Sequence, residues 1–411
     1  MSVINLFSAS HCYGNEVAQG LCDKLGYKAL SDEALLKEAA QRFQVSEERL
    51  DRTMHGVVSV FNSFTHEKER NTAFLRASLA ELVQPDNLVY HGFAGHLLPK
   101  ELTHVLRVCL VAPRKHRAGM AAKTEGISEE AAEKQIRNDD EARGRWTLHL
   151  FGLGPWDESL YDVLVPMDST SVEAAVDLIA EQTLTPPVKT TSTSQKSMMD
   201  FLLTAQVQLA LVQKGHDVDL GVASDDGNVT LTINRYVLML ENLKKRLREV
   251  TLGVSGVKDV KIDLGPHFRP LNRYEQMAED YAPAPKFLLV DDEKEFVLTL
   301  SERLKTRNLG AAVAHDGEEA LSILEADTPD VMVLDLKMPG IQGLEVLQRV
   351  KREKPDTEVI ILTGHGSAQE EQQAMDLGAF AYLNKPVDID VLAETMRKAY
   401  EKIKSPKEDA S

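Results

Sequence analysis

The chain has 411 residues, which is too long for one ordinary core and predicts two to three domains. A net charge of -17 argues against a general polyanion-binding surface, because phosphate affinity comes mainly from Lys and Arg. No apolar run is long enough to span a bilayer, and the first residues lack the pattern of a signal peptide. Three cysteines are too few for a disulfide framework or a zinc knuckle. We therefore expect a reduced, cytoplasmic, multidomain α/β protein with no integral membrane segment.

Two segments are predicted to be linkers. Residues 184–197 combine adjacent prolines with a Ser/Thr/Lys cluster and lack an apolar period, which favours an extended, solvated chain. Residues 266–285 end in a Pro-Ala alternation that cannot continue a helix. The chain is therefore expected to divide into domains at residues 1–183, 198–265 and 286–405.

The first domain opens with a predicted buried strand, VINLFSAS, and a helix in HCYGNEVAQGLCDKLGYKAL. A strand, a Gly-bearing turn and a helix N-terminus form a natural anion site. A working phosphate loop reads GxxxxGK[ST], whereas here no lysine follows Gly14 and Glu16 lies at the mouth. His11 and Cys12 lack further metal ligands, so we interpret them as ordinary loop residues. The candidate cofactor-binding residues of this loop are Ser10, Gly14 and Asn15.

These segments, with VYHGFAGHLL, VLRVCLVAPRKHRAGM and LYDVLVPMDSTSVEAAVDLI downstream, resemble the cytidylate kinase-like family of P-loop kinases. The resemblance implies a P-loop kinase-like α/β fold and a basic lid that clamps phosphates near Arg137, Arg143 and Arg145. The absent lysine weakens the neutralisation of a triphosphate. Nucleotide transfer, nucleotide or anion binding without turnover, and a scaffold for packing or dimerisation all stay open. Arg143 and Arg145 are alternatively part of a solvated helix face.

Residues 198–265 predict a small α+β domain. Two helices are expected in MMDFLLTAQVQLALVQKG and VLMLENLKKRLREVTLGV, and VDLGVASDDGNVTLTINR predicts two strands around a turn. VSGVKDVKIDLG predicts a closing strand. The order, especially DGNVTLTI and VSGVKDVKIDL, resembles a BON-like module, a family of small binding or membrane-proximal domains. With no catalytic constellation in it, this part is interpreted as an interaction domain.

Residues 286–405 alternate short apolar runs with amphipathic stretches, which predicts five βα units and a doubly wound parallel sheet. Asp291 and Asp292 end the first strand, Asp335 the third, Thr363 the fourth and Lys385 the fifth. Strand ends in such a sheet meet at one crevice. Three carboxylates repel unless a cation joins them, and Mg²⁺ fits such a cluster. A carboxylate can also attack phosphorus, giving an aspartyl phosphate.

The stretches LLVDDEKE, VLDLKMPGIQGLEVL, LTGHG and AFAYLNKPVD resemble the receiver domain of two-component response regulators, which has a flavodoxin-like (βα)5 fold. The resemblance makes Asp335 the phosphoacceptor and implies that the phosphoryl group is contacted by Thr363 and Lys385. Thr363 and Tyr382 would be the switch, and the Lys385–Pro386 bond is expected to be cis. The implied Mg²⁺ ligands are Asp291, Asp292, Asp335 and the backbone carbonyl of Lys337.

The resulting hypothesis is a response regulator that receives a phosphoryl group from a sensor histidine kinase or a phosphotransfer protein. Its output is expected to be contact with another protein, because the upstream domains show no concentrated basic recognition helix for DNA. The alternative is a nucleoside monophosphate kinase regulated by its receiver, against which the missing lysine argues. The output protein has no signature in the sequence, and a homodimer stays open.

Overall fold

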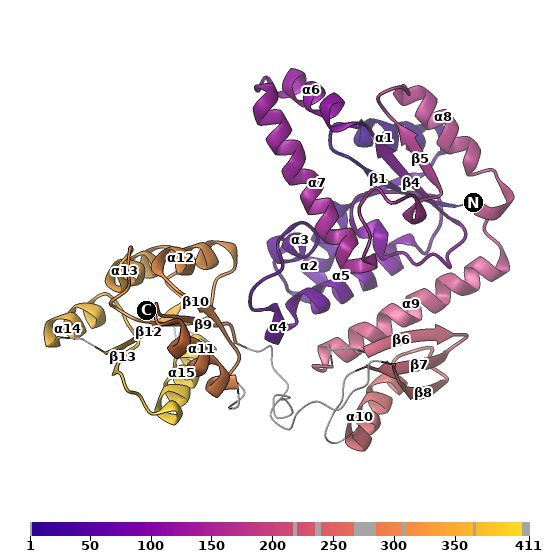
Figure 1. Ribbon diagram of the computed structural model, residues 1–411. Coiled ribbons are helices and arrows are strands. Elements are labelled where there is room, and N and C mark those ends of the chain that lie inside the picture. The colour runs from indigo at the N-terminus through magenta and orange to yellow at the C-terminus, as the bar shows by residue number, and fades with distance from the viewer. Residues whose placement is uncertain are drawn as a thin grey trace, which may run out of the picture. The chain divides into compact units, whose positions relative to one another are not determined.

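A computed structural model describes residues 2–216, 220–234, 240–266, 285–305, 307, 309–364 and 367–404. The chain forms two compact units, and each contains two separate stretches of sequence. The first unit is Met1–Val57 with Lys68–Arg269, and the second is Val58–Glu67 with Pro270–Ser411. The multidomain α/β class predicted from the sequence is confirmed (Figure 1).

The first unit is built on a five-stranded sheet in the order β2-β3-β1-β4-β5, with every pair parallel. The central strand β1 is buried along almost its whole length, as expected for a parallel sheet covered on both faces. The strands are β1 (Val3–Ser8), β2 (Lys28–Ser31), β3 (Leu88–His91), β4 (Val105–Val111) and β5 (Val163–Pro166).

Helix α1 (Gly14–Leu25) follows β1, as the apolar spacing predicts. It ends at Gly26, whose φ of 69° lies in the left-handed region that favours glycine. The residues that follow form β2 instead of extending the helix. The other helices of the first unit before residue 190 are α2 (Asp32–Phe43), α3 (Glu47–His55), α5 (Glu67–Val83), η1 (Ala94–Leu97), α6 (Arg114–Glu125), α7 (Glu129–Phe151), η2 (Glu158–Leu160), α8 (Val172–Gln182) and η3 (Pro186–Val188).

The middle part of the chain has the predicted order of two helices and three strands. They are α9 (Ser192–Gln213), β6 (Leu220–Asp225), β7 (Asn228–Ile233), α10 (Leu240–Leu252) and β8 (Asp259–Leu264). Strands β6 and β7 pair antiparallel as the predicted hairpin, and β8 pairs parallel with β7. The predicted small α+β fold is therefore confirmed for the residues that the structure describes.

Helix α9 begins inside the segment that the sequence predicts to be an extended linker. The side chain of Thr191 accepts a hydrogen bond from the Ser194 backbone N–H, and Ser194 reciprocates, which forms a capping box. The extended conformation is thus wrong for residues 192–197. The second predicted linker, residues 266–285, lies almost wholly outside the described residues.

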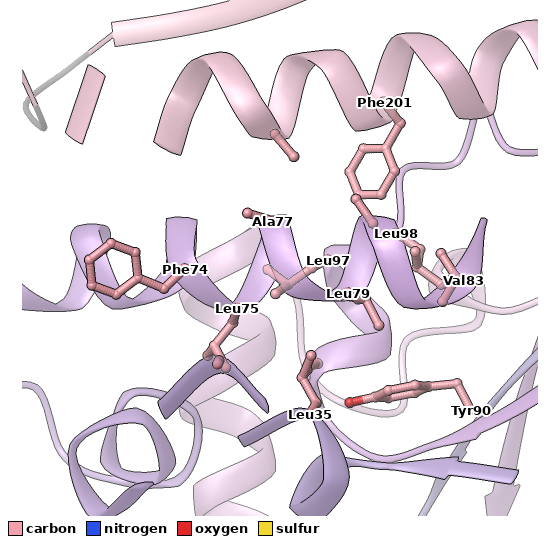
Figure 2. Packing of buried hydrophobic residues seen from close by; sticks show 14 of the residues in the cluster. Leu35, Phe74, Leu75, Ala77, Leu79, Val83, Tyr90, Leu97, Leu98 and Phe201 are labelled. Atoms are coloured by element: carbon pink, nitrogen blue, oxygen red, sulfur yellow. The ribbon is translucent and has the colours of Figure 1, made fainter. Parts of the chain in front are cut away.

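The same helix joins the middle part to the core of the first unit. Phe201 of α9 is buried in one cluster with Leu79 and Val83 of α5, and its ring points toward α5 (Figure 2). Val207 and Leu211 of α9 belong instead to the cluster that covers the small sheet. One helix therefore serves two cores, and the division into three domains stays a prediction.

The second unit contains a parallel sheet in the order β10-β9-β11-β12-β13. Buried clusters cover both faces of the sheet, so the predicted doubly wound arrangement is confirmed. Its strands are β9 (Phe287–Val290), β10 (Ala311–Ala314), β11 (Val331–Leu334), β12 (Glu358–Thr363) and β13 (Ala381–Asn384). Its helices are α11 (Lys294–Lys305), α12 (Gly317–Ala326), α13 (Gly343–Glu353), α14 (Ala368–Asp376), α15 (Ile389–Lys404) and the short α4 (Asn62–Thr65). Among the described helices, none is both long and apolar enough to cross a lipid bilayer.

The buried His96 of η1 makes the stability of the first unit depend on pH. Its Nδ1 lies 3.2 Å from the Phe93 carbonyl and its Nε2 lies 3.2 Å from the Tyr161 hydroxyl. Burial lowers the pKa of His96 to about 4. As pH falls below about 6.5, His96 becomes protonated in the unfolded chain but stays neutral in the folded chain. The free energy of unfolding therefore decreases between about pH 6.5 and the folded pKa of about 4.

We expect the free energy of unfolding to fall by about 2 kcal/mol between pH 7 and pH 5 because of this residue. Urea unfolding followed by tryptophan fluorescence measures it, since both tryptophans, Trp146 and Trp156, lie in the first unit. A His96→Gln variant should lose less stability over this range. The exposed His116→Gln is the matched control, and an equal pH slope in all three proteins would contradict the prediction.

Candidate metal and phosphoacceptor site

The site lies where the neighbouring parallel strands β9 and β11 end. Asp291 follows β9, and its backbone N–H donates to the Ala314 carbonyl over 3.1 Å. Asp335 follows β11, and its backbone N–H donates to the Val290 carbonyl over 3.0 Å. These bonds extend the ladder by one residue beyond the strands. They hold both aspartate backbones at the carboxyl edge of the sheet.

Three carboxylates meet at this edge. Oxygen atoms of Asp291, Asp292 and Asp335 all lie within 4.8 Å of one another, and no other described residues bring three or more His, Cys, Asp or Glu ligands so close together. Asp291 and Asp335 are 4% and 6% exposed, while Asp292 is not buried. Buried like charges raise each other's energy, and a divalent cation with oxygen ligands removes that cost. The donor set therefore fits Mg²⁺.

Lys385, directly after β13, supplies a positive charge to the cluster. Its Nζ lies 2.6 Å from Asp291 Oδ2, 2.9 Å from Asp335 Oδ2 and 3.5 Å from Glu293 Oε1. The ammonium also stands 4.6 Å from the centre of the Phe296 ring. The Lys385–Pro386 peptide bond is cis, as predicted.

Burial and charge act in opposite directions on these groups. Burial disfavours the charged form of Lys385, but its hydrogen bonds to Asp291 and Asp335 outweigh that effect and raise its pKa. Burial raises the pKa of Asp291, even though the lysine and the Glu293 backbone N–H both favour its charged form. The lysine is therefore a fixed cation, and it leaves the cluster with an excess of negative charge.

A tight loop follows the central carboxylate. The Lys337 backbone N–H donates to Asp335 Oδ1 over 3.3 Å. At Gly343, the first residue of α13, a Cβ atom would lie only 2.1 Å from the Asp335 carbonyl oxygen, so the approach needs glycine. The loop therefore holds the Asp335 side chain in place through a backbone N–H group. The Lys337 carbonyl as a metal ligand stays a prediction.

Two hydroxyls stand without a hydrogen-bond partner in this body. Thr363 ends β12 at the same edge of the sheet and is 1% exposed, and its Oγ1 makes no hydrogen bond. Tyr382 lies on β13 opposite Ile361, and its hydroxyl is also buried without a partner. Burial raises the pKa of Tyr382. An unpaired buried hydroxyl costs free energy, and a phosphoryl oxygen could satisfy it.

Sequence reasoning missed two members of this environment. Glu293 stands near Lys385, and Phe296 lies under its ammonium. Glu293 is the next residue after the acidic pair, which is a usable signal, because a strand end usually continues into the site. Phe296 carries no such signal, since an aromatic residue at helical spacing is usually part of a core.

The candidate anion loop of the first unit is largely occupied by its own contacts. Ser8 Oγ lies 3.0 Å from His91 Nε2, a residue that sequence reasoning also missed. Arg143 donates from Nε to the Ser8 carbonyl over 2.9 Å and from Nη1 to the Asp139 carbonyl over 3.0 Å. The buried Ser10 Oγ has no partner. The structure thus brings Arg143 to this loop, with two of its donor atoms already used.

The remaining candidates of the first unit are less closely gathered. Gly14 begins α1 and Asn15 is exposed at its first turn. Arg145 donates instead to the carbonyl of His55 over 2.9 Å, at the end of α3, and Arg137 is exposed on α7. The expected lid arginines therefore do not converge on one point in this structure.

Cys12 and His11 do not form a reactive pair. Burial raises the pKa of the Cys12 thiol to about 11, so it is protonated and a poor nucleophile. The His11 Nε2 lies 3.3 Å from Glu125 of α6. These contacts agree with their interpretation as loop residues.

Comparison with known proteins identifies the second unit. Residues 287–397 match the family model of the response regulator receiver domain. Sporulation initiation phosphotransferase F of Bacillus subtilis is 35% identical over 113 residues, which are 28% of this chain and 91% of that protein. The chain belongs to the response regulator receiver family. Response regulator MprA of Mycobacterium avium is 35% identical over 125 residues, which are 30% of this chain and 54% of MprA.

The receiver match covers 30% of this chain and 54% of MprA. The chain spans about half the length of the MprA sequences it matches. A crystal structure of a receiver domain protein from Clostridium thermocellum is 34% identical, with a TM-score of 0.28, and covers 29% of this chain and 97% of that one. Residues 3–169 match the cytidylate kinase-like family model, which confirms the second resemblance. These two matches leave the middle part uncovered, so its BON-like character stays a prediction.

Removing the Lys385 charge should strengthen cation binding by the receiver. In Lys385→Met, Asp291 and Asp335 lose the ammonium that competes with a metal for their oxygens. We expect the dissociation constant for Mg²⁺ to fall about tenfold, because one charge among three carboxylates is worth at least 1.4 kcal/mol. Isothermal titration calorimetry measures it. Lys294→Met, an exposed lysine at the start of α11, should bind as the wild type does. Unchanged affinity in Lys385→Met would show that the ammonium does not compete.

Proposed function

We propose that this chain is a two-component response regulator whose Asp335 accepts a phosphoryl group from a sensor histidine kinase or a phosphotransfer protein. The observation that carries the proposal is the meeting of Asp291, Asp292, Asp335 and Lys385 at one sheet edge. Membership of the receiver family supports it. The residues proposed to hold Mg²⁺ are the three aspartates, with the Lys337 carbonyl as a further ligand.

The proposed step is a transfer between a nitrogen and an oxygen. A carboxylate oxygen of Asp335 attacks the phosphorus of a phosphohistidine, the P–N bond breaks, and the imidazole nitrogen leaves with the electron pair and takes up a proton. Mg²⁺, when bound, supplies positive charge to the phosphoryl oxygens. Lys385 Nζ, 2.9 Å from Asp335 Oδ2, places a second positive charge close to the position where the phosphoryl oxygens would carry negative charge.

Thr363 and Tyr382 are proposed to read the new group. Both hydroxyls are buried without a hydrogen-bond partner, so each gains a bond by moving toward an added acceptor. A small local change of this kind can bias a two-state element. The proposed output is contact with a protein partner, and a cytoplasmic location and a homodimer stay predictions.

Phosphorylation of the full chain with acetyl phosphate and Mg²⁺ tests the proposal. The wild type should gain one acid-stable, hydroxylamine-sensitive phosphoryl group, and Asp335→Asn should gain none, because an amide is not a nucleophile toward phosphorus. Intact mass spectrometry counts the group. Asp376→Asn, an exposed aspartate of α14, is the control, and chelation with EDTA should abolish labelling. Equal labelling of Asp335→Asn would overturn the assignment.

A nucleoside monophosphate kinase regulated by its receiver is the second candidate. The match of residues 3–169 to the cytidylate kinase-like family favours it, as does the unpartnered Ser10 hydroxyl beside the start of α1. The loop lacks the lysine that reaches the β- and γ-phosphates, and Arg143 already spends two donor atoms on backbone carbonyls.

We therefore expect no transfer from ATP to CMP by the full chain above that of a reaction without protein. Release of ADP in the presence of CMP and Mg²⁺ measures it. A thermal-shift series with ATP, CMP and inorganic phosphate separates binding without turnover from no binding, since a ligand of the folded state raises its stability. Turnover that saturates with CMP would put the kinase function first.

A further inference from the structure

A short stretch of the N-terminal sequence is part of the receiver body. Residues 58–67 follow α3 and include α4, yet they form one compact unit with the receiver, while the residues on either side of them belong to the first unit. The stretch lies inside the sequence matched by the cytidylate kinase-like family and outside that matched by the receiver family. We call residues 58–67 the inserted segment.

The inserted segment contributes an aromatic residue to the receiver core. Phe61 is fully buried, in the same apolar cluster as Leu288 of β9, Ala314 of β10 and Leu324 of α12. Phe64 packs beside it, with ring centres 5.9 Å apart. Because a buried phenylalanine is among the largest single contributors to a core, this cluster is incomplete without the segment.

A glycine of the receiver leaves room for the ring of Phe64. A Cβ atom at Gly310, just before β10, would lie 2.9 Å from Phe64 Cγ. The backbone of Gly310 does not have a positive φ, so glycine is not needed there for conformation. Its absent side chain is therefore best explained by the space that Phe64 takes.

A buried ion cluster holds the same segment. Lys286 Nζ lies 2.6 Å from Glu67 Oε2 and 2.8 Å from Asp327 Oδ1, and the Ser59 hydroxyl donates to the Asp327 carboxylate. The side chains of Lys286, Glu67 and Asp327 are 8%, 15% and 12% exposed. Removing one member of a buried cluster leaves the others uncompensated, so these contacts specify the docked position.

Helix α12 connects this contact to the phosphoacceptor loop. At its first residue, Gly317, a Cβ atom would lie 2.7 Å from the Ile341 carbonyl, in the loop between Asp335 and α13. At its other end, the residue Asp327 binds Lys286 and Ser59. The 10 residues of α12 form one continuous helix between these two contacts. We take this helix as the element through which a shift of the loop would reach Asp327.

We propose that the inserted segment is the resident partner of the receiver surface formed by Lys286, Gly310 and Asp327, and that this contact couples the phosphorylation state of Asp335 to the N-terminal unit. The coupling rests on the proposed function, whereas the docking does not. Because coupling is reciprocal, a change at Asp335 that alters docking must be matched by an effect of docking on the Asp335 site.

Hydrogen exchange of the full chain, followed by mass spectrometry, tests the docking. Phe61→Ala should raise exchange about tenfold in the receiver peptides that contain β9 and α12, because the core loses its ring. Val60→Ala, at a position 51% exposed in the same segment, should change nothing. Gly310→Val and the isosteric Glu67→Gln should loosen the inserted segment itself. Receiver peptides that exchange in Phe61→Ala as in the wild type would overturn the docking.

The same measurement with acetyl phosphate and Mg²⁺ tests the coupling. Exchange of residues 58–67 should change at least threefold in the labelled wild type, a threshold near 0.65 kcal/mol, and stay constant in Asp335→Asn. Intact mass of each sample reports whether Asp335 is labelled, so a failure of phosphorylation is distinguished from a failure of coupling. A fully labelled wild type with unchanged exchange in this segment would overturn the coupling.

Discussion

The ammonium of Lys385 between Asp291 and Asp335 is the interaction on which the rest of the receiver depends. Two nearly buried carboxylates and a third beside them repel one another at one sheet edge, and the ammonium reduces that repulsion. The lysine balances one of the three carboxylate charges, and one divalent cation would balance the remaining two. Asp335, the proposed phosphoacceptor, belongs to the same cluster and contacts the same ammonium. The charges that hold the strand ends together are therefore the same charges that the proposed phosphoryl transfer needs.

The receiver site could be read almost completely from the sequence, because its residues follow buried strands. Once five short apolar runs are assigned to a parallel sheet, the topology brings Asp291, Asp335 and Lys385 together with no further information. Glu293 was within reach of the same reasoning. The unpaired state of the Thr363 and Tyr382 hydroxyls was not, since it depends on the packing around each oxygen.

The errors have local causes. The Pro-Pro and Ser/Thr composition of residues 184–197 suggested a linker, but Thr191 and Ser194 are a capping box that starts α9. On α7, the family resemblance places Arg143 and Arg145 in one lid, and that role stays a prediction. Residues two apart on a helix point about 200° apart, so the first reaches the Ser8 carbonyl and the second reaches His55. The contact of the inserted segment with the receiver could not be predicted, because no local pattern in residues 58–67 indicates a contact with residues far along the chain.

That distance along the chain bears on how the protein is made. Ser59 and Asp327 are 268 residues apart, so their contact closes one of the longest loops available to this polypeptide. During synthesis the inserted segment leaves the ribosome long before any receiver strand exists. Phe61 therefore lacks its buried site until the receiver strands have been translated. The receiver core is complete only after both parts of the chain exist, and a nascent chain that stalls before residue 286 leaves Phe61 without the apolar cluster that buries it.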